Sequence, residues 1–319
     1  MTDREVTAGE VTADQVTVPQ FDIMLPYYGD VGLMQDAVRS VLALDGDDWR
    51  LTVVDDGTDP EVPDWFEKLD DSRVRYFRNE RNLGVTGNFN RCLELTTFDH
   101  VVLMGSDDLM HPNYLRVVRE ALRSAPGAAM VQPGVLVIDG AGRPVDTLAD
   151  SVKRRLYAPK EQGPGELGGE ELAVSLLRGN WLYFPSICWR TDAVRERGFR
   201  EDLKVIQDLA LVMELVVAGE RLAVAEEVCF SYRRHALSES SAQAFTGDRF
   251  TEAQRFFLET AQRMDGVGWK RAALTARRHR STRLHALTMA PAAIGRGQVR
   301  AAGTLVRFAV GPAGSPSRQ

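Results

Sequence analysis

The sequence predicts an α/β protein with a mostly parallel central sheet flanked by helices, followed by a helical C-terminal region. Over the first ~110 residues, short apolar runs alternate with stretches whose apolar residues recur at helical spacing, which is typical of parallel sheets. Three polar clusters, at Asp30, at Asp55-Asp56 and at Asp107-Asp108, fall at or just beyond the ends of the apolar runs. From Gly247 onward the composition is that of helices.

The first half of the chain divides into four expected strands and two helices. The first strand covers 21–25 and is expected to stop at Pro26, because proline has no N–H for a sheet ladder. Residues 31–44 place their apolar side chains on one face, as an amphipathic helix does. Three further strands are expected at 50–54, 74–77 and 101–104, and a second helix at 88–95.

The second half alternates helices and strands less regularly. A helix is expected at 114–122 and a strand at 128–138, with a hairpin turn at 139–142. The Pro- and Gly-rich stretch 157–169 is expected to form an exposed loop over the site. Helices at 172–177 and 209–217 and a strand at 186–189 complete the expected elements.

The apolar run 101–104 delivers two adjacent carboxylates, Asp107 and Asp108, near its end. Two acids in this place are costly unless a positive charge neutralises them, and a hard divalent cation bridging phosphate oxygens is the simplest such partner. Because loops at one edge of a parallel sheet converge, the three polar clusters are expected side by side. The alternative is that Asp107 and Asp108 only cap a helix that starts near Pro112.

The composition indicates a folded protein of one large domain or of a domain with an appendage. The chain has 319 residues, of which 44% are hydrophobic, so disorder is excluded for most of it. Residues 1–20 lack a basic start and an apolar segment, and we expect a flexible tail rather than a secretory signal. Cys92, Cys188 and Cys229 are odd in number and form no C-x-x-C pair, which argues against a disulfide framework or a structural zinc. A reducing cytoplasm is the expected compartment.

The charge is distributed unevenly along the chain. The net charge is −6, yet the residues after Asp265 include ten Lys and Arg and no Asp or Glu. A basic end with apolar stretches such as 284–294 suggests contact with an anionic membrane surface or an acidic lipid carrier on the cytoplasmic face. The alternative is an ordinary helix pair with an Arg-rich solvated face. No apolar run reaches the ~18 residues that span a bilayer, and without interleaved aromatics no nucleic-acid partner is expected.

Four short motifs follow one another in a specific order. They are 23–28 (IMLPYY), 53–58 (VVDDGT), 82–90 (NLGVTGNFN) and 106–108 (SDD). In this order and spacing, the chain resembles the family 2 glycosyltransferases of GT-A fold over roughly residues 21–240.

The resemblance implies a GT-A, Rossmann-like domain at 21–245 between the N-terminal tail 1–20 and a basic helical region at 246–319. Within that domain, it implies a nucleotide-binding half at 21–110 and an acceptor-binding half at 111–245.

On the donor side, the resemblance implies that Asp56 accepts a hydrogen bond from the nucleotide base. A carboxylate suits this role because N3 of uracil or thymine carries a hydrogen, and UDP or dTDP sugars are therefore favoured. The alternative for Asp56 is an ordinary Asp-Gly turn, and for the asparagines a turn followed by a helix cap. The further implied donor contacts are Pro26, Tyr27, Tyr28, Asn82, Gly84, Asn88, Asp107 and Arg234.

The segment 106–108 lies where the family carries its D-x-D metal signature, from which Ser106 departs. The resemblance implies that Asp108 binds Mg²⁺ or Mn²⁺ and that Asp107 supports the metal or the ribose. It implies that His235 is a third metal ligand or a phosphate donor, next to an arginine pair, Arg233 and Arg234, that neutralises phosphate. The alternative for His235 is a structural role.

On the acceptor side, Gln207-Asp208 resembles an element that usually reads Glu-Asp, and the resemblance implies that Asp208 is the general base. Gln207 replaces the usual Glu, so the role of that side chain is open. Glu201 and Asp202 are competing carboxylates nearby, and the alternative for Asp208 is a helix N-cap. Three aromatic residues could wall the base, stack on a sugar or pack in the core: Trp181, Tyr183 and Phe184.

The implied activity is an inverting, metal-dependent hexosyltransferase. It would move a sugar from a nucleoside-diphosphate donor to a hydroxyl acceptor on a glycan, a lipid-linked chain or a small molecule, in cell-surface glycan or secondary-metabolite biosynthesis. One metal and one base suffice for a single in-line displacement. The alternatives are a nucleotidyltransferase-like enzyme, although no Gly-rich basic loop follows the first strand, and a non-catalytic module that binds nucleotide sugars.

Overall fold

The computed structural model describes residues 20–145, 166–234, 248–295 and 299–310. The strands are β1 (Phe21–Tyr27), β2 (Trp49–Asp55), β3 (Val74–Arg78), β4 (His100–Leu103), β5 (Leu109–Met110), β6 (Ala128–Ile138), β7 (Glu166–Leu167), β8 (Cys188–Arg190) and β9 (Arg221–Arg233). The helices of the sheet domain are α1 (Val31–Leu42), α2 (Glu61–Glu67), α3 (Gly84–Glu94), α4 (Tyr114–Ser124), α6 (Gly169–Arg178), the 3₁₀ turn η1 (Phe184–Ser186), α7 (Thr191–Arg197) and α8 (Gln207–Val217). The C-terminal helices are α10 (Asp248–Gly266), α11 (Lys270–Arg278), α12 (Arg280–Gly295) and α13 (Val299–Val310).

These strands form one nine-stranded sheet in the order β3-β2-β1-β4-β8-β6-β9-β5, with β7 paired to β9. The first four strands pair in parallel, as expected. Beyond β4 the sheet contains strand pairs of both directions. Strand β8 runs antiparallel to both β4 and β6, whereas β6 and β9 are parallel. The predicted α/β architecture with a helix-flanked central sheet is confirmed, and its purely parallel part is the N-terminal half.

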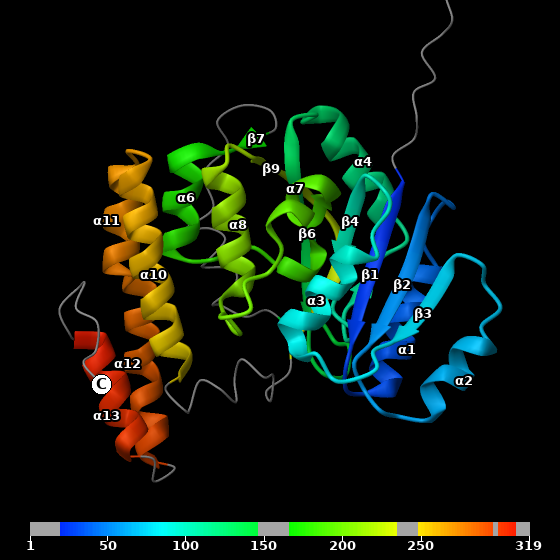
Figure 1. The fold of residues 1–319 in the computed structure, drawn as a ribbon, viewed down its shortest axis with the longest axis horizontal. Coiled ribbons are helices and arrows are strands. Elements are labelled where there is room, and N and C mark those ends of the chain that lie inside the picture. The colour runs from blue at the N-terminus through cyan, green and yellow to red at the C-terminus, as the bar shows by residue number, and fades with distance from the viewer. Residues whose placement is uncertain (1–19, 146–165, 235–247, 296–298, 311–319) are drawn as a thin grey trace, which may run out of the picture.

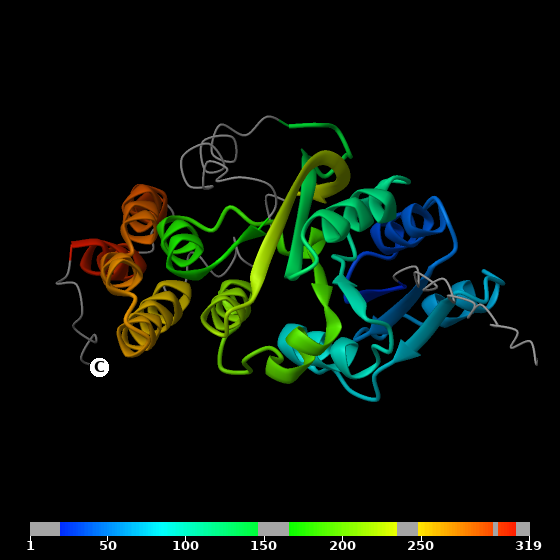
Figure 2. The same cartoon turned by 90° about the horizontal axis from the view of Figure 1, so that it is seen from above.

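Helices cover both faces of the sheet (Figures 1 and 2). Because side chains alternate along a strand, Ile23 and Leu25 of β1 join the core under α1 and α4, while Met24 joins the core under α3 and α8. Figure 2 shows α1 and α4 on one side of the sheet and α3 on the other. This layering leaves the carboxyl ends of β1, β2 and β4 at one edge.

Two of the element boundaries that differ from the sequence expectations have a clear physical cause. β1 continues through Pro26 to Tyr27, since β1 pairs with β4 only over Phe21–Met24 and the missing N–H of Pro26 lies beyond that pairing. Helix α3 starts at Gly84, four residues earlier than expected, because the carboxylate of Asp56 accepts hydrogen bonds from the backbone N–H groups at its start.

The expected hairpin turn at 139–142 is confirmed by hydrogen bonds between Asp139 and Arg143 and by an antiparallel bridge between Ile138 and Pro144. The expected loop at 157–169 lies mostly outside the described residues. Its last part forms β7 and the start of α6.

The C-terminal helices form two groups. Phe256 and Phe257 of α10 and Ala272 of α11 belong to the same buried core as α6 and α8. A smaller core around Phe250 joins α10 to α12 and α13. Figure 1 shows these four helices beside α6 and α8, on the side of the molecule away from β3. Among the described residues, no helix has the length and apolar character that crossing a bilayer requires.

Candidate functional site

The candidate site lies where β1, β2 and β4 end, next to the end of β9. Adjacent strand order brings these ends together, and ligands bind at the carboxyl edge of parallel strands in open α/β sheets. Of the three polar clusters, Asp30 has a local function: its carboxylate accepts the N–H of Leu33 at 2.9 Å and caps α1. The other two clusters face the site.

Asp55 supports the loop after β2. Its buried carboxylate accepts hydrogen bonds from the Tyr76 hydroxyl at 2.5 Å, the Arg78 guanidinium at 2.7 Å and the backbone N–H of Gly57 at 2.8 Å. Burial, and then the carboxylate of Asp55, raises the pKa of Tyr76. Asp55 therefore fixes the loop after β2.

Asp56 organises the start of α3. It is buried and accepts hydrogen bonds from Asn79 Nδ2 at 2.8 Å and from the backbone N–H groups of Leu83 at 2.8 Å and Gly84 at 2.9 Å. Gly84 has φ +71°, a conformation that favours glycine. Asn82 Nδ2 donates to the Asp56 carbonyl at 3.0 Å. The motif 82–90 is thus held to the end of β2 through one carboxylate.

Asn88 lies one helical turn further along α3. Its Nδ2 donates to the carbonyl of Val54 at 3.0 Å, and its Oδ1 accepts from Asn79. Asn88 is buried, so this side chain ties α3 to β2 rather than capping a helix.

The three residues that end β1 differ in their environment. Tyr27 is buried and its hydroxyl donates to the carbonyl of Gly29 at 2.9 Å. Burial, and secondarily the nearby Asp55, raises the pKa of Tyr27 to about 12. Tyr28 is 68% exposed, and Pro26 is half-buried. Tyr28 is therefore the residue of this segment whose ring is open to a ligand.

Asp108 is a carboxylate with an unsatisfied oxygen in the interior. The residue is 1% exposed. Its Oδ1 accepts the backbone N–H of Arg233, at the end of β9, at 2.8 Å. Its Oδ2 is buried without a hydrogen-bond partner. Burial and the neighbouring Asp107 raise the pKa of Asp108 well above the usual value for an aspartate.

Gly105 makes room for that unsatisfied oxygen. A Cβ at this position would lie 2.5 Å from Asp108 Oδ2 and 3.1 Å from Asp107 Oδ1. An unpaired buried carboxylate is costly, and hard divalent cations prefer carboxylate oxygens. The residues present therefore fit a divalent cation at Asp108, although no group of three or more His, Cys, Asp and Glu side chains gathers within the described part of the chain.

Neither Asp107 nor Asp108 caps a helix, because β5 follows them and α4 begins only at Tyr114. Arg233 also differs from the expectation that it neutralises phosphate. Its guanidinium donates to the carbonyls of Asp107 at 2.7 Å, Gly140 at 3.2 Å and Asp139 at 3.3 Å. Arg233 is thus a structural residue that holds the end of β9 against Asp108.

Arg234, the next residue, is exposed. Its backbone N–H donates to the carbonyl of Ile138 at 2.9 Å. His235 lies outside the described residues.

Asp208 is the second residue of α8, whose N-cap is Ile206, so the alternative role of Asp208 as an N-cap is wrong. Asn180 Nδ2 lies 3.3 Å from Asp208 Oδ2. Tyr232 connects this residue to the acids after β4: burial, and then Asp108 and Asp107, raises the pKa of Tyr232 to about 12, and Asp208 adds to that shift. Asp107, Asp108 and Asp208 therefore all act electrostatically on one tyrosine.

The competing carboxylates lie differently. Asp202 forms ion pairs with Arg200 at 2.8 Å and Arg255 at 3.0 Å, which turn it toward α10. The hydrogen bond from Arg200 holds the pKa of Asp202 below its usual value. Glu201 is exposed. Gln207 is buried, with its Oε1 2.8 Å from the hydroxyl of Thr86, so it joins α8 to α3.

The three aromatic residues divide between core and site. Trp181 is buried and its Nε1 donates to Ser175, and Phe184 packs among Phe89, Phe199 and Trp189. Tyr183 has its ring centroid 5.4 Å from that of Tyr232. Of the three, Tyr183 therefore packs against Tyr232, whose pKa the site carboxylates raise.

Comparisons with known proteins find relatives of the chain. Residues 22–165 match the family model "Glycosyl transferase family 2". The chain is 24% identical over 234 residues to WcaA of Escherichia coli K12, named as a glycosyl transferase of colanic acid biosynthesis, covering 72% of this chain and 78% of WcaA.

Two solved structures share the fold. TarS of S. aureus in complex with UDP-GlcNAc superimposes with a TM-score of 0.64 at 16% identity, covering 91% of this chain and 81% of that one. The mannosyltransferase PcManGT of Pyrobaculum calidifontis, in complex with GDP-Man and Mn²⁺, gives a TM-score of 0.55 at 16% identity, covering 95% and 90%.

The open sheet, its acidic strand ends and these relatives define a glycosyltransferase of GT-A fold. Within that class, residues 22–165 are similar to glycosyltransferase family 2.

We expect Asp108→Asn to stabilise the metal-free protein near neutral pH by about 1 kcal/mol, or about 2–4 °C in the unfolding midpoint. The physical reason is that burial raises the pKa of Asp108, so its contribution to stability is present at low pH and is lost as the pH rises through the folded-state pKa. Thermal unfolding in EDTA, scanned from pH 8 toward pH ~4, should show a difference that narrows at acidic pH. The exposed Asp36→Asn serves as the control, and a variant less stable than the wild type at pH 8 would contradict the prediction.

We expect Gly105→Ala to weaken binding of Mn²⁺ by about 10- to 100-fold, because the new Cβ displaces Asp108 Oδ2 from its position. Calorimetric titration with MnCl₂ measures this affinity. Gly303→Ala is the matched control, since a Cβ at Gly303 meets nothing within 4 Å. Equal affinities for the wild type and Gly105→Ala would exclude Asp108 as the ligand.

Proposed function

We propose that the protein is an inverting, metal-dependent glycosyltransferase that moves a sugar from a nucleoside-diphosphate donor, with UDP or dTDP favoured, to a hydroxyl group of an acceptor. The observation that carries this proposal is the buried Oδ2 of Asp108, which has no hydrogen-bond partner among the described residues. Asp107, Asp108 and Asp208 also all raise the pKa of Tyr232. Asp108 would suit a cation, and Asp208 would suit a base.

On the donor side, Asp56 would accept a hydrogen bond from N3 of the base. A carboxylate offers about four lone-pair sites, and the hydrogen bonds from Asn79, Leu83 and Gly84 orient it. The exposed ring of Tyr28 would lie against the base. The loops around the base would be held by Asn82 and Asn88, whose side chains donate to backbone carbonyls. Pro26 and Gly84 would also line this place, with Tyr27 beneath it.

Asp108 would hold Mg²⁺ or Mn²⁺, with Asp107 and His235 as further ligands and Arg234 near the phosphates. Such a cation offsets the negative charge that grows on the leaving diphosphate. The Mn²⁺ in the complex of PcManGT supports this assignment. The chain's own contribution is to hold Asp108 through the N–H of Arg233 and to exclude side chains from position 105.

Asp208 would act as the general base. The acceptor oxygen forms a bond to the anomeric carbon, the bond from that carbon to the diphosphate oxygen breaks, and the acceptor proton passes to the Asp208 carboxylate. Attack opposite the leaving group inverts the anomeric centre. Asn180 lies beside Asp208 and would orient the base. Tyr183, which packs against Tyr232, would orient the sugar.

The product would be a cell-surface glycan, with a secondary metabolite as the other class of product. The colanic acid function in the name of WcaA supports the glycan. The donors bound to TarS and PcManGT, UDP-GlcNAc and GDP-Man, support a sugar nucleotide as substrate. We propose that the reaction takes place in the cytoplasm.

The proposal predicts that one nucleoside diphosphate, UDP or dTDP, stabilises the protein in the presence of Mn²⁺ and not in EDTA. Ligand at ~100 times its dissociation constant adds about 2.7 kcal/mol to the free energy of unfolding. A thermal-shift panel of UDP, dTDP, GDP and ADP measures this, and Asp108→Ala should lose the shift. No shift with any nucleotide would return Asp107 and Asp108 to a structural role.

With the base identified, turnover of the matching sugar nucleotides separates the enzyme from the alternatives. Asp208→Asn should bind the nucleotide as the wild type does and release nucleoside diphosphate at least ~10²-fold more slowly. Release of pyrophosphate would indicate a nucleotidyltransferase. Binding without any turnover by the wild type would indicate a non-catalytic module.

The basic C-terminal region would contact an anionic membrane surface. Leu284, Leu287 and Ile294 are exposed on α12 at spacings of three and seven residues, with Arg280 one turn before Leu284 on the same face. We expect sedimentation with vesicles of anionic phospholipid and not with phosphatidylcholine alone, lost in the double variant Leu284→Ser/Ile294→Ser. The exposed Leu274→Ser on α11 is the control. Equal sedimentation with both vesicles would refute the electrostatic contact.

A further inference from the structure

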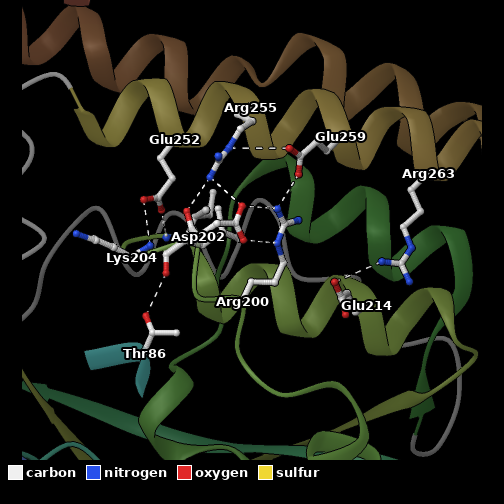
Figure 3. Close-up of polar contacts among 11 residues, drawn as sticks. Thr86, Arg200, Asp202, Lys204, Glu214, Glu252, Arg255, Glu259 and Arg263 are labelled. Atoms are coloured by element: carbon white, nitrogen blue, oxygen red, sulfur yellow. Dashed lines mark hydrogen bonds and ion pairs between the residues drawn. The ribbon is translucent and has the colours of Figure 1, made fainter. Parts of the chain in front are cut away.

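The loop that leads into α8 is held from two sides (Figure 3). From α3, the hydroxyl of Thr86 lies 3.1 Å from the carbonyl of Leu203. Asn90, on the same helix, accepts the N–H of Phe199 at 2.7 Å and donates to its carbonyl at 3.0 Å. The opposite side of the loop faces α10, which follows in the chain about forty residues later.

Glu252 of α10 accepts three consecutive backbone N–H groups of this loop. One carboxylate oxygen accepts from Lys204 at 3.0 Å, and the other accepts from Val205 at 2.8 Å and Ile206 at 3.0 Å. Helix α8 has no side-chain cap of its own at Ile206. Glu252 therefore binds the N-cap residue of α8 and the two residues before it from another element. Its negative charge suits the N-terminal end of the helix dipole.

Ion pairs next to Glu252 fix α10 on the same loop. Arg255 donates to the carbonyl of Asp202 at 2.7 Å and pairs with its carboxylate at 3.0 Å. Arg200 pairs with Asp202 at 2.8 Å and with Glu259 of α10 at 2.9 Å. These contacts turn the competing carboxylate Asp202 away from the site and make α10 the outer wall of the loop.

Asp208 lies two residues after Ile206, whose N–H is the last that Glu252 binds. Its position depends on where the first turn of α8 starts, and that turn starts at the loop that Glu252 holds. A displacement of about 1 Å in a reacting group can cost about 10²-fold in rate. The loop has no other carboxylate on these three N–H groups among the described residues.

We infer that Glu252 is a positioning residue for the general base, so that the C-terminal helix α10 is a working part of the acceptor side of the active site. This inference rests on the proposed function of Asp208. Glu252 acts through the backbone of 204–206 and does not itself contact donor or acceptor.

The experiment compares Glu252→Ala, Glu252→Gln and the control Arg263→Gln in the full-length chain. Arg263→Gln removes a contact of α10 with Glu214 of α8 at 3.4 Å and leaves the loop hydrogen bonds in place. We expect Glu252→Ala to lower kcat by about 10- to 100-fold, with the donor KM and the nucleoside-diphosphate affinity within about twofold of the wild type. Glu252→Gln keeps an acceptor oxygen and should recover part of kcat, and the control should retain wild-type kcat.

Amide hydrogen exchange of 204–206 provides a second readout. Exchange should accelerate in Glu252→Ala and not in Arg263→Gln, while circular dichroism shows the same helix content in both. Unchanged exchange, or accelerated exchange with an unchanged kcat, would overturn the positioning role alone. An equal loss of kcat in the control would assign the effect to docking of α10 in general and would overturn it as well. Absence of turnover by the wild type with every sugar nucleotide would instead overturn the proposed function, and the inference with it.

Discussion

The carboxylate of Asp56 at the start of α3 is the interaction on which the arrangement of both substrate sides depends. A helix N-terminus attracts anions, and here the anion is a side chain of the preceding strand end. Once α3 is fixed at this end, Asn88 ties it to β2. Thr86 and Asn90 on the same helix hold the loop before α8. A single helix thus sets the distance between the loop after β2 and the loop that leads into α8.

The acids after β4 differ from Asp56 in how their oxygens are hydrogen-bonded. Asp56 is satisfied by the chain, whereas Asp108 keeps one oxygen without a partner in the interior. Such a group lowers the stability of the metal-free fold and is retained where a ligand completes it. The N–H of Arg233 holds the other carboxylate oxygen, and the absence of a side chain at Gly105 leaves space for Oδ2. The site is therefore organised before any ligand arrives.

The parts of the site that the sequence predicts well are those set by neighbouring residues in the chain. The strand ends at Asp55-Asp56 and Asp107-Asp108 follow from apolar runs and are at the predicted edge. The roles of Arg233, Gln207 and Glu252 could not be predicted, because each depends on contacts between elements far apart in the chain. The antiparallel direction of β8 has the same origin, since a three-residue strand carries too little pattern to show its direction. A glutamate on a polar helix face gives no sequence signal that it caps another helix.

The shared core of α8 and α10 has a consequence for how such enzymes diverge. The family model ends at residue 165, before the segments that form α6, α8 and α10. Here those segments are joined by a buried surface that includes Phe256 and Phe257. Exchange of acceptor preference between relatives would then require α8 and α10 to be inherited together, as a matched pair. A chimera that joins the helices after residue 247 of one relative to the α8 segment of another would pack α8 against an α10 with different core side chains.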